Sequence, residues 1–177
     1  MIFRVKINKK IKEWMDITKK FIIYLFELAD REQDENKLTL LFDCTDGSIS
    51  NVDIDLLLFI LSLIRNYYPM LLNAVLVYQL PWILNYVLKL VNSWLPQSHR
   101  EIIHPITKKQ LYENVHLDQL PDFLGGICEM PYKTVPKEVP SADDLAKKLS
   151  LGKSAADKLV RHLEPYIMSS HLANDFS

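Results

Sequence analysis

One stretch of the sequence, YYPMLLNAVLVYQLPWILNYVLKLVNSWL at residues 67–95, contains a single charged residue, Lys89. Pro69 and Pro81 interrupt this stretch and Pro96 follows it. Because proline breaks helices, the longest continuous piece is shorter than the ~20 residues that a helix needs to cross a bilayer. The stretch therefore predicts a buried strand followed by an apolar helix, and we expect no membrane span here.

Apolar runs and helical patterns alternate around this stretch. Residues 2–7 predict a short strand, and residues 16–31 carry apolar side chains at helical spacing. Residues 38–44 and 74–80 are almost continuously apolar, which is typical of strands buried on both faces of a sheet. The order strand, helix, strand, helix, strand, helix favours an α/β fold with crossover helices.

The helices between these strands have recognisable ends. The segment VDIDLLLFILSLIRNYY predicts an apolar helix that ends before Pro69, with a cap at Ser50 or Asn51. Pro81 precedes the next helix, at residues 82–95. Residues 102 and 103 predict one more short strand, and residues 108–114 a helical turn.

The sequence changes character after residue 116. LDQLPDFLGG ends in Gly125 and Gly126, and because glycine adopts backbone angles closed to other residues, we expect a tight reversal there. EMPYKTVPKEVP then carries three prolines, typical of an extended linker.

Two short helices are expected to close the chain, opened by Ser141 with Asp144 and by Ser154 with Asp157. The sequence thus predicts a main domain over residues 1–130, followed at 131–177 by a Pro-rich linker and a short helical extension.

Charge and cysteine usage narrow the function classes. A net charge of -1 argues against a nucleic-acid surface, so no nucleic-acid partner is expected. Cys44 and Cys128 show no zinc-binding spacing and predict free thiols in a reducing compartment. The start, MIFRVKINKKIKEW, has a basic run but no apolar core of a signal peptide, so a cytoplasmic protein is expected.

The sequence offers little support for catalysis. Its four glycines form no phosphate-binding loop, its five histidines no HExxH pair, and Cys44 has no identifiable base. Asp43 and Asp46 follow a buried strand, where α/β enzymes place catalytic carboxylates or magnesium ligands, and the alternative is that both cap turn amides. We expect no enzyme, no cofactor and no metal.

The helix at residues 82–95 has more apolar surface than a helix on a sheet requires. Its polar residues Asn85, Lys89 and Asn92 form one narrow stripe, whereas about a 100° apolar arc is usual. The helix is either buried on two sides, or it turns a second apolar face to a cavity or a membrane.

Two segments carry a family resemblance: NYYPMLLNAVLVYQLPWILNYVLKLVNSWLP and REIIHPITKKQLYENVHLDQLPDFLGG. With YYP before a buried strand, PW opening an apolar helix, a short IIH strand and the LP-x-x-LGG ending, residues 2–126 resemble the CRAL-TRIO lipid-binding domain. The resemblance implies a mixed β-sheet floor covered by helices, and a mobile gate at residues 82–95 over a hydrophobic pocket.

The resemblance also implies a function: binding, and exchange at membranes, of a lipid or another lipophilic small molecule. Contact with membranes is expected to be peripheral and to include the endoplasmic reticulum. The alternative is a protein-interaction or scaffold module with an incomplete pocket and a protein partner. The expected lipid-contacting residues are Leu40, Phe42, Leu76, Tyr78, Trp82, Leu84, Val87, Leu88, Val91 and Leu95.

Two departures from the family pattern shape these expectations. Met1 stands within the family's module, so we expect the early helices to be missing and the pocket to be open on one side. Met70 and Ile102 occupy the positions of the acidic residue and the lysine found in phosphatidylinositol-transfer members. We therefore expect no phosphoinositide specificity, and interpret Arg100 and Lys108 as surface charge.

Overall fold

The computed structural model describes residues 1–32, 37–129 and 139–168. The chain divides into two compact units, which are described separately. The first, called the sheet unit, comprises Met1–Lys10 and Asp16–His116. The second, called the helical unit, comprises Ile11–Met15 and Leu117–Ser177.

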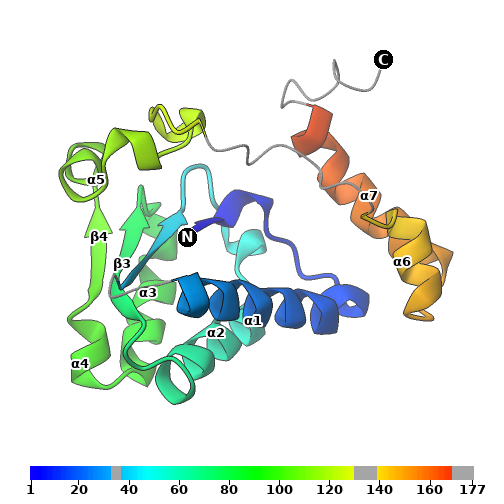
Figure 1. Cartoon of the computed structure of the whole chain (residues 1–177), viewed down its shortest axis with the longest axis horizontal. Coiled ribbons are helices and arrows are strands. Elements are labelled where there is room, and N and C mark those ends of the chain that lie inside the picture. The colour runs from blue at the N-terminus through cyan, green and yellow to red at the C-terminus, as the bar shows by residue number, and fades with distance from the viewer. Residues whose placement is uncertain (33–36, 130–138, 169–177) are drawn as a thin grey trace. The chain divides into compact units, whose positions relative to one another are not determined.

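The sheet unit has the α/β fold that the sequence predicts. Its strands are β1 (Ile2–Arg4), β2 (Leu38–Asp43), β3 (Leu72–Tyr78) and β4 (Ile103–Ile106). They lie in the order β1-β2-β3-β4 (Figure 1). All three pairings are parallel, so the described part of the sheet lacks the antiparallel member that a mixed sheet would have.

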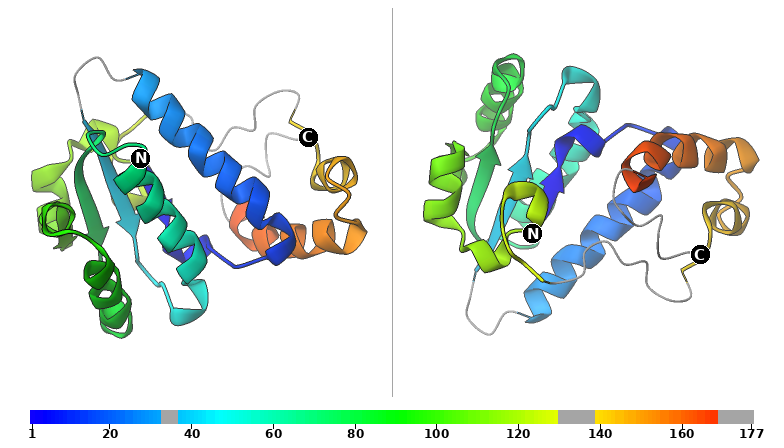
Figure 2. Two further views of the ribbon diagram at one scale, coloured as in Figure 1. Left: turned by 90° about the horizontal axis from the view of Figure 1, so that it is seen from below. Right: turned by 90° about the horizontal axis from the view of Figure 1, so that it is seen from above.

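Helices α1 (Met15–Glu32) and α2 (Ile54–Asn66) lie on the same side of this sheet (Figure 2). Both predicted helices are thus confirmed. They form the main core with one face of β2 and β3, and burial of this apolar surface is the dominant stabilising contribution. The core residues are Ile22, Phe26, Leu40, Ile60, Leu63, Ile64, Tyr68, Leu71, Leu72 and Val75.

The connection from β3 to β4 is helical. It consists of the 3-10 helix η4 (Trp82–Leu84), α3 (Asn85–Trp94) and the short α4 (Gln97–Arg100). After β4, helix α5 (Lys108–Asn114) has the predicted bounds, and the Thr107 side chain accepts a hydrogen bond from the Gln110 amide at its start.

Two local predictions in the sheet unit were wrong. The strand predicted at residues 2–7 ends at Arg4, because Val5–Ile7 form the 3-10 helix η1. The carbonyls of Lys6 and Asn8 accept hydrogen bonds from the Asn51 side chain, at 2.9 and 3.0 Å, and not from a neighbouring strand. With Asn51 so engaged, Asp53 caps α2 instead, accepting from the Leu56 amide at 3.2 Å.

The helical unit contains the 3-10 helices η2 (Lys12–Trp14), η5 (Leu117–Gln119) and η6 (Asp122–Leu124), and then α6 (Ala142–Lys148) and α7 (Lys153–Met168). Ser141 caps α6 as predicted. Ser154 does not cap α7, because the helix already begins at Lys153. Most of the predicted Pro-rich linker, residues 130–138, lies outside the described residues.

The predicted reversal at the glycine pair is confirmed, and each glycine has its own reason. Gly125 has a φ of 80°, a left-handed conformation that strains other residues. A Cβ on Gly126 would stand 1.9 Å from the Leu120 carbonyl oxygen. The chain folds back here, and the Ile127 and Cys128 amides donate to the carbonyls of Leu117 and Leu120.

Candidate functional site

The four strand residues expected to contact lipid lie on two different faces of the sheet. Leu40 pairs with Val75, whereas its neighbour Leu41 pairs with Leu76. Since successive side chains in a strand point to opposite faces, Leu40 and Phe42 share one face, and Leu76 and Tyr78 the other. Leu40 and Phe42 belong to the core with α1 and α2. The structure therefore does not bring all four to one cavity.

The expected gate helix is held at its ends. Leu84, just before α3, has 2% of its surface exposed, and Leu95, just after it, has 4%. Both leucines act as anchors. Between them, no residue of α3 is buried, although α2 buries Ile60, Leu63 and Ile64. The predicted contact residues Val87, Leu88 and Val91 are half-buried.

The outer side of the gate helix is aromatic. Trp82 is 81% exposed and Tyr86 is 73% exposed, and Lys89 is exposed as well. Tyr86 and Lys89 are three residues apart and lie on one side of α3, and Trp82 precedes that helix in η4. Trp82, expected to contact a bound lipid, therefore points to solvent. The sequence reasoning missed Tyr86, because it counted that residue with the apolar positions.

The polar stripe of this helix is only partly solvated. Asn85 and Lys89 are exposed, but the Oδ1 atom of Asn92 is buried and lacks a hydrogen-bond partner among the described residues. A buried acceptor without a partner costs about 1–3 kcal/mol. The buried Oδ1 atom of Asn92 therefore destabilises the position that α3 has in this structure.

The candidate catalytic residues have structural roles. The Asp43 Oδ1 atom accepts from the Thr45 amide at 3.1 Å, as expected of a turn-capping aspartate, and Asp46 pairs with Lys6 at 3.1 Å. Burial, and then the negative charge of Asp43, raises the pKa of the Cys44 thiol to about 12. A thiol with so high a pKa is a poor nucleophile at neutral pH.

The two cations that the sequence singled out, Arg100 and Lys108, also have local partners. The Arg100 Nε atom donates to the Leu95 carbonyl at 2.7 Å, which ties α4 to the end of α3. The Lys108 ammonium lies 6.0 Å from the centre of the Tyr112 ring. Both interactions are consistent with ordinary surface residues.

Within the described ranges, no three His, Cys, Asp or Glu side chains gather in a way that could hold a metal ion. None of the described helices is both long and apolar enough to cross a membrane. Cys44 and Cys128 are free thiols, as predicted.

In the helical unit, a cavity of about 220 Å³ is lined by Asp143, Ala146, Lys147, Gly152 and Lys153. It is smaller than the roughly 300–1,000 Å³ of usual ligand pockets. Because three of its five lining residues are charged, this cavity does not suit an acyl chain.

Comparison with known proteins agrees with the sequence resemblance. A "CRAL-TRIO domain-containing protein C3H8.02" of Schizosaccharomyces pombe is 27% identical over 121 residues, covering 68% of this chain and 27% of that protein. A "Phosphatidylinositol transfer protein CSR1" of Eremothecium gossypii is 29% identical over 89 residues, covering 50% of this chain and 20% of that protein. The chain thus spans about a quarter or less of the length of these relatives.

The family described as "CRAL/TRIO domain" matches residues 2–126, the range over which the sequence carries the resemblance. The match includes all four strands and ends at the glycine pair. The YYP, PW and LGG segments quoted above lie inside it. With well over half of its residues matched, the chain belongs to the CRAL/TRIO domain family.

Proposed function

We propose that this protein binds a single lipid or another lipophilic molecule and exchanges it at membranes. One observation carries the proposal: α3 is mostly apolar, and yet none of its residues is buried between the anchors Leu84 and Leu95. A helix held at its ends and loosely packed between them suits a gate that opens and closes. Val87, Leu88 and Val91 are its lipid-contacting residues, and on the strands Leu76 and Tyr78 are the proposed liners.

The energetics suit exchange better than chemistry. Transferring an acyl chain of about 16 methylenes out of water is worth ~0.8 kcal/mol per methylene. Relative to a bilayer, the same transfer gains almost nothing. A carrier therefore needs an apolar pocket for transit and a segment that opens at the membrane, but no catalytic group, and we assign it neither an enzyme activity nor a cofactor.

Native mass spectrometry of protein purified without detergent tests ligand binding. One lipid released per chain on gentle activation is the expected result. A transfer assay between vesicles then tests the gate, because Leu88→Asp with Val91→Asp should abolish transfer. The matched control is Asn85→Asp with Ser93→Asp, which adds the same charge at exposed positions of α3. Equal transfer by both variants would remove α3 from the mechanism.

A substitution at Asn92 tests the gate by stabilising α3 in its closed position, where the preceding variants disrupt it. Replacing it with Leu removes the buried acceptor and adds apolar surface, so the closed position of α3 becomes more stable. Asn92→Leu should therefore slow lipid exchange without lowering the amount of bound lipid. Unchanged exchange would show that the closed position does not limit the rate.

The outer side of the gate helix supports the proposal of peripheral membrane contact. Tryptophan and tyrosine favour the boundary between lipid and water, and a lysine beside them can reach anionic headgroups. Trp82→Ala with Tyr86→Ala should reduce co-sedimentation with phosphatidylserine-containing vesicles. If co-sedimentation is unaffected, the exposed aromatics have another role.

A finer placement within the family rests on sequence alone. FRVK, LLFDCTDGSISNVDID and PWILNYVLKLVNSWL resemble, in the same order, the CRAL-TRIO domain of motile sperm domain-containing protein 2. This likeness supports a cytoplasmic protein that visits the endoplasmic reticulum, with the lipid-binding part at residues 1–130 and an extension at 131–177. Fractionation of cells expressing the chain should recover part of it with endoplasmic reticulum membranes. Its absence from them would argue against this placement.

The second candidate function is a protein-interaction module. The observation that favours it is an exposed apolar side on α1, a helix whose other side is already in the core. A protein that carries no lipid but self-associates or binds a partner would support this alternative.

A further inference from the structure

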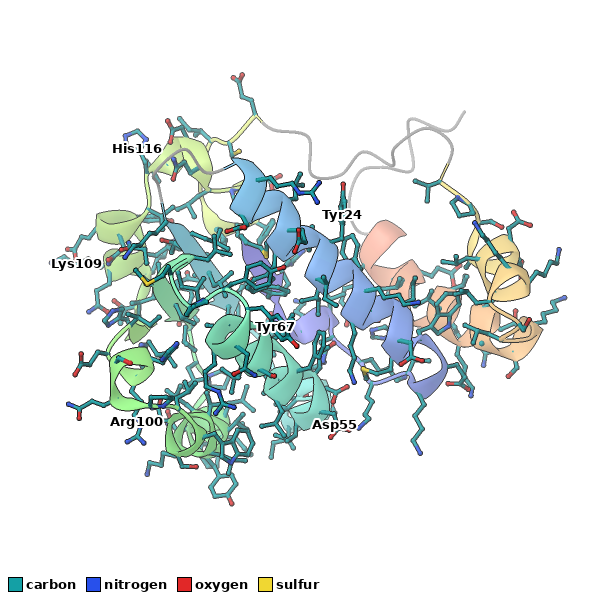
Figure 3. All side chains as sticks on the ribbon, turned by 60° about the horizontal axis from the view of Figure 1, so that its bottom comes forward. Tyr24, Asp55, Tyr67, Arg100, Lys109 and His116 are labelled. Carbon is teal, nitrogen blue, oxygen red and sulfur yellow. The ribbon has the colours of Figure 1, made fainter. Side chains whose placement is uncertain are left out.

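Helix α1 has two apolar sides. One side carries Ile22 and Phe26, which are buried in the core of the sheet unit. On the other side, Phe21 is 58% exposed and Tyr24 is 59% exposed. Tyr24 projects from α1 away from α2 (Figure 3). Packing against the sheet therefore does not account for this second side.

The second side has the spacing of a helix-pairing seam. Ile17, Phe21, Tyr24 and Leu28 follow one another at intervals of four, three and four residues. Alternating intervals of four and three are those of the heptad repeat, in which two helices interlock their apolar side chains. Ile17 is half-buried and Leu28 is exposed, so all four are at least partly accessible.

Charged residues border this seam on one flank. Lys20 is exposed, and the Glu27 side chain keeps 46% of its surface exposed. In an antiparallel pair of identical helices, this flank of one helix faces the same flank of the other. Lys20 then stands opposite Glu27 of the partner subunit, and the pair occurs twice by symmetry. A parallel pairing sets Lys20 opposite the partner's Leu25 and forms no such pair.

We propose that two copies of this chain associate through antiparallel α1 helices. Phe21 packs against the partner's Tyr24, and Ile17 against the partner's Leu28, so that all four apolar residues are used in one register. Interfaces below about 1,200 Å² are typical of weak complexes. A seam of four apolar residues per copy falls in that class, and we expect a concentration-dependent dimer with a micromolar dissociation constant.

Charge reversal provides a sharp test by analytical ultracentrifugation of the full chain. Lys20→Glu sets like charges opposite each other twice and should weaken the dimer at least tenfold, and so should Glu27→Lys. A mixture of the two variants restores both opposite-charge pairs, so heterodimers should form. The control Lys109→Glu makes the same charge change on the far side of the sheet unit from Tyr24 (Figure 3) and should dimerise like the unaltered protein.

Folding of each variant is checked by its circular dichroism melting curve, since Glu27 also accepts a hydrogen bond from Tyr68 at 2.6 Å. If Glu27→Lys unfolds, Phe21→Ser with Tyr24→Ser replaces it and should give a monomer. An unaltered chain that stays monomeric at millimolar concentration overturns the proposal. So does a dimer that Lys20→Glu leaves intact, because another surface must then hold it.

Discussion

The indole Nε1 atom of Trp14 donates a hydrogen bond to the Ala155 carbonyl at 2.8 Å, in a buried position. Trp14 lies just before α1 in the sequence, and Ala155 lies in the first turn of α7. Lys158 and Glu13 form an ion pair beside this contact. Ile11–Met15 thereby become part of the helical unit, although a sequence divided at residue 130 would assign them elsewhere.

Trp14→Ala should destabilise the helical unit by about 3–5 kcal/mol, the usual cost of deleting a buried aromatic side chain. Urea unfolding, monitored by amide hydrogen exchange in α6 and α7, measures this loss of stability. Trp82→Ala is the matched control, because Trp82 is 81% exposed and its loss should change stability by less than about 0.5 kcal/mol. Equal effects of the two changes would contradict the anchoring role of Trp14.

Stability should fall at alkaline pH. Burial, and then the charge of Asp43, raises the pKa of Cys44 from its ordinary 9.0 to about 12. The folded protein therefore retains a proton that the unfolded chain releases, so stability is complete below pH 9 and declines between pH 9 and 12, by at most about 1.4 kcal/mol per pH unit. Burial and the hydrogen bond to Glu27 raise the pKa of Tyr68 to about 12, in the same direction.

Urea unfolding midpoints at pH 8 and at pH 10.5, with each pH held within about 0.1 pH unit, measure this decline in stability. Cys44→Ala should make the pH dependence shallower, whatever it does to stability at neutral pH. The same slope in both proteins would mean that Cys44 does not titrate differently on unfolding.

Asp53→Ala should reduce stability by about 0.5–2 kcal/mol, because it removes the acceptor that caps the first turn of α2. Lys10, whose ammonium lies 3.8 Å from the Asp53 carboxylate, loses a partner as well. Ser50→Ala, at a position that the sequence suggested as the cap, should change stability by less than about 0.5 kcal/mol. Thermal melts of both variants decide between the two caps.

Amide hydrogen exchange should be faster in α3 than in α2, by about tenfold or more, because local opening is easiest where few side chains are buried. Helix α2 buries three apolar residues, whereas α3 buries none. Exchange followed by mass spectrometry compares the two helices within one sample. Equal protection would indicate that α3 is not a separately moving gate.

Gly126→Ala should disrupt the segment around residues 117–128, because the new Cβ would overlap the Leu120 carbonyl, which is backbone and cannot rotate away. Gly152→Ala is a milder control: it meets no atom within 4 Å, and only its φ of 77° is unfavourable, at ~1–2 kcal/mol. Proteolysis rates of the two variants measure the difference. A more stable Gly126→Ala protein would show that the reversal is not tightly packed.

Elements governed by local chemistry were predictable. The sequence predicted the strand at β2, the helices α1 and α2 and the bounds of α5, because these elements follow from residue patterns at short spacing. The pair Gly125 and Gly126 predicted the tight reversal that the structure has there. One error involves a residue distant in the sequence: Val5–Ile7 form a 3-10 helix, and the Asn51 side chain donates to the Lys6 carbonyl within it.

The candidate site could be predicted only in part. The sequence singled out residues 82–95, because an apolar helix with one narrow polar stripe is unusual. It could not assign faces, since β2 and β3 are apolar on both sides and periodicity then carries no information. The strand register separates Leu40 and Phe42 from Leu76 and Tyr78, and burial shows that Trp82 faces outward while Leu84 and Leu95 anchor the helix.

The sequence by itself determined where most of the helices and strands lie, and which family the chain resembles, because both depend on residue types at short spacing. Only the tertiary structure decided which apolar residues are core, anchor or free surface. Hydrophobic burial has no direction, so an apolar side chain does not specify its partner. The contact of Trp14 with Ala155, and the second side of α1, emerge only when the whole chain has folded.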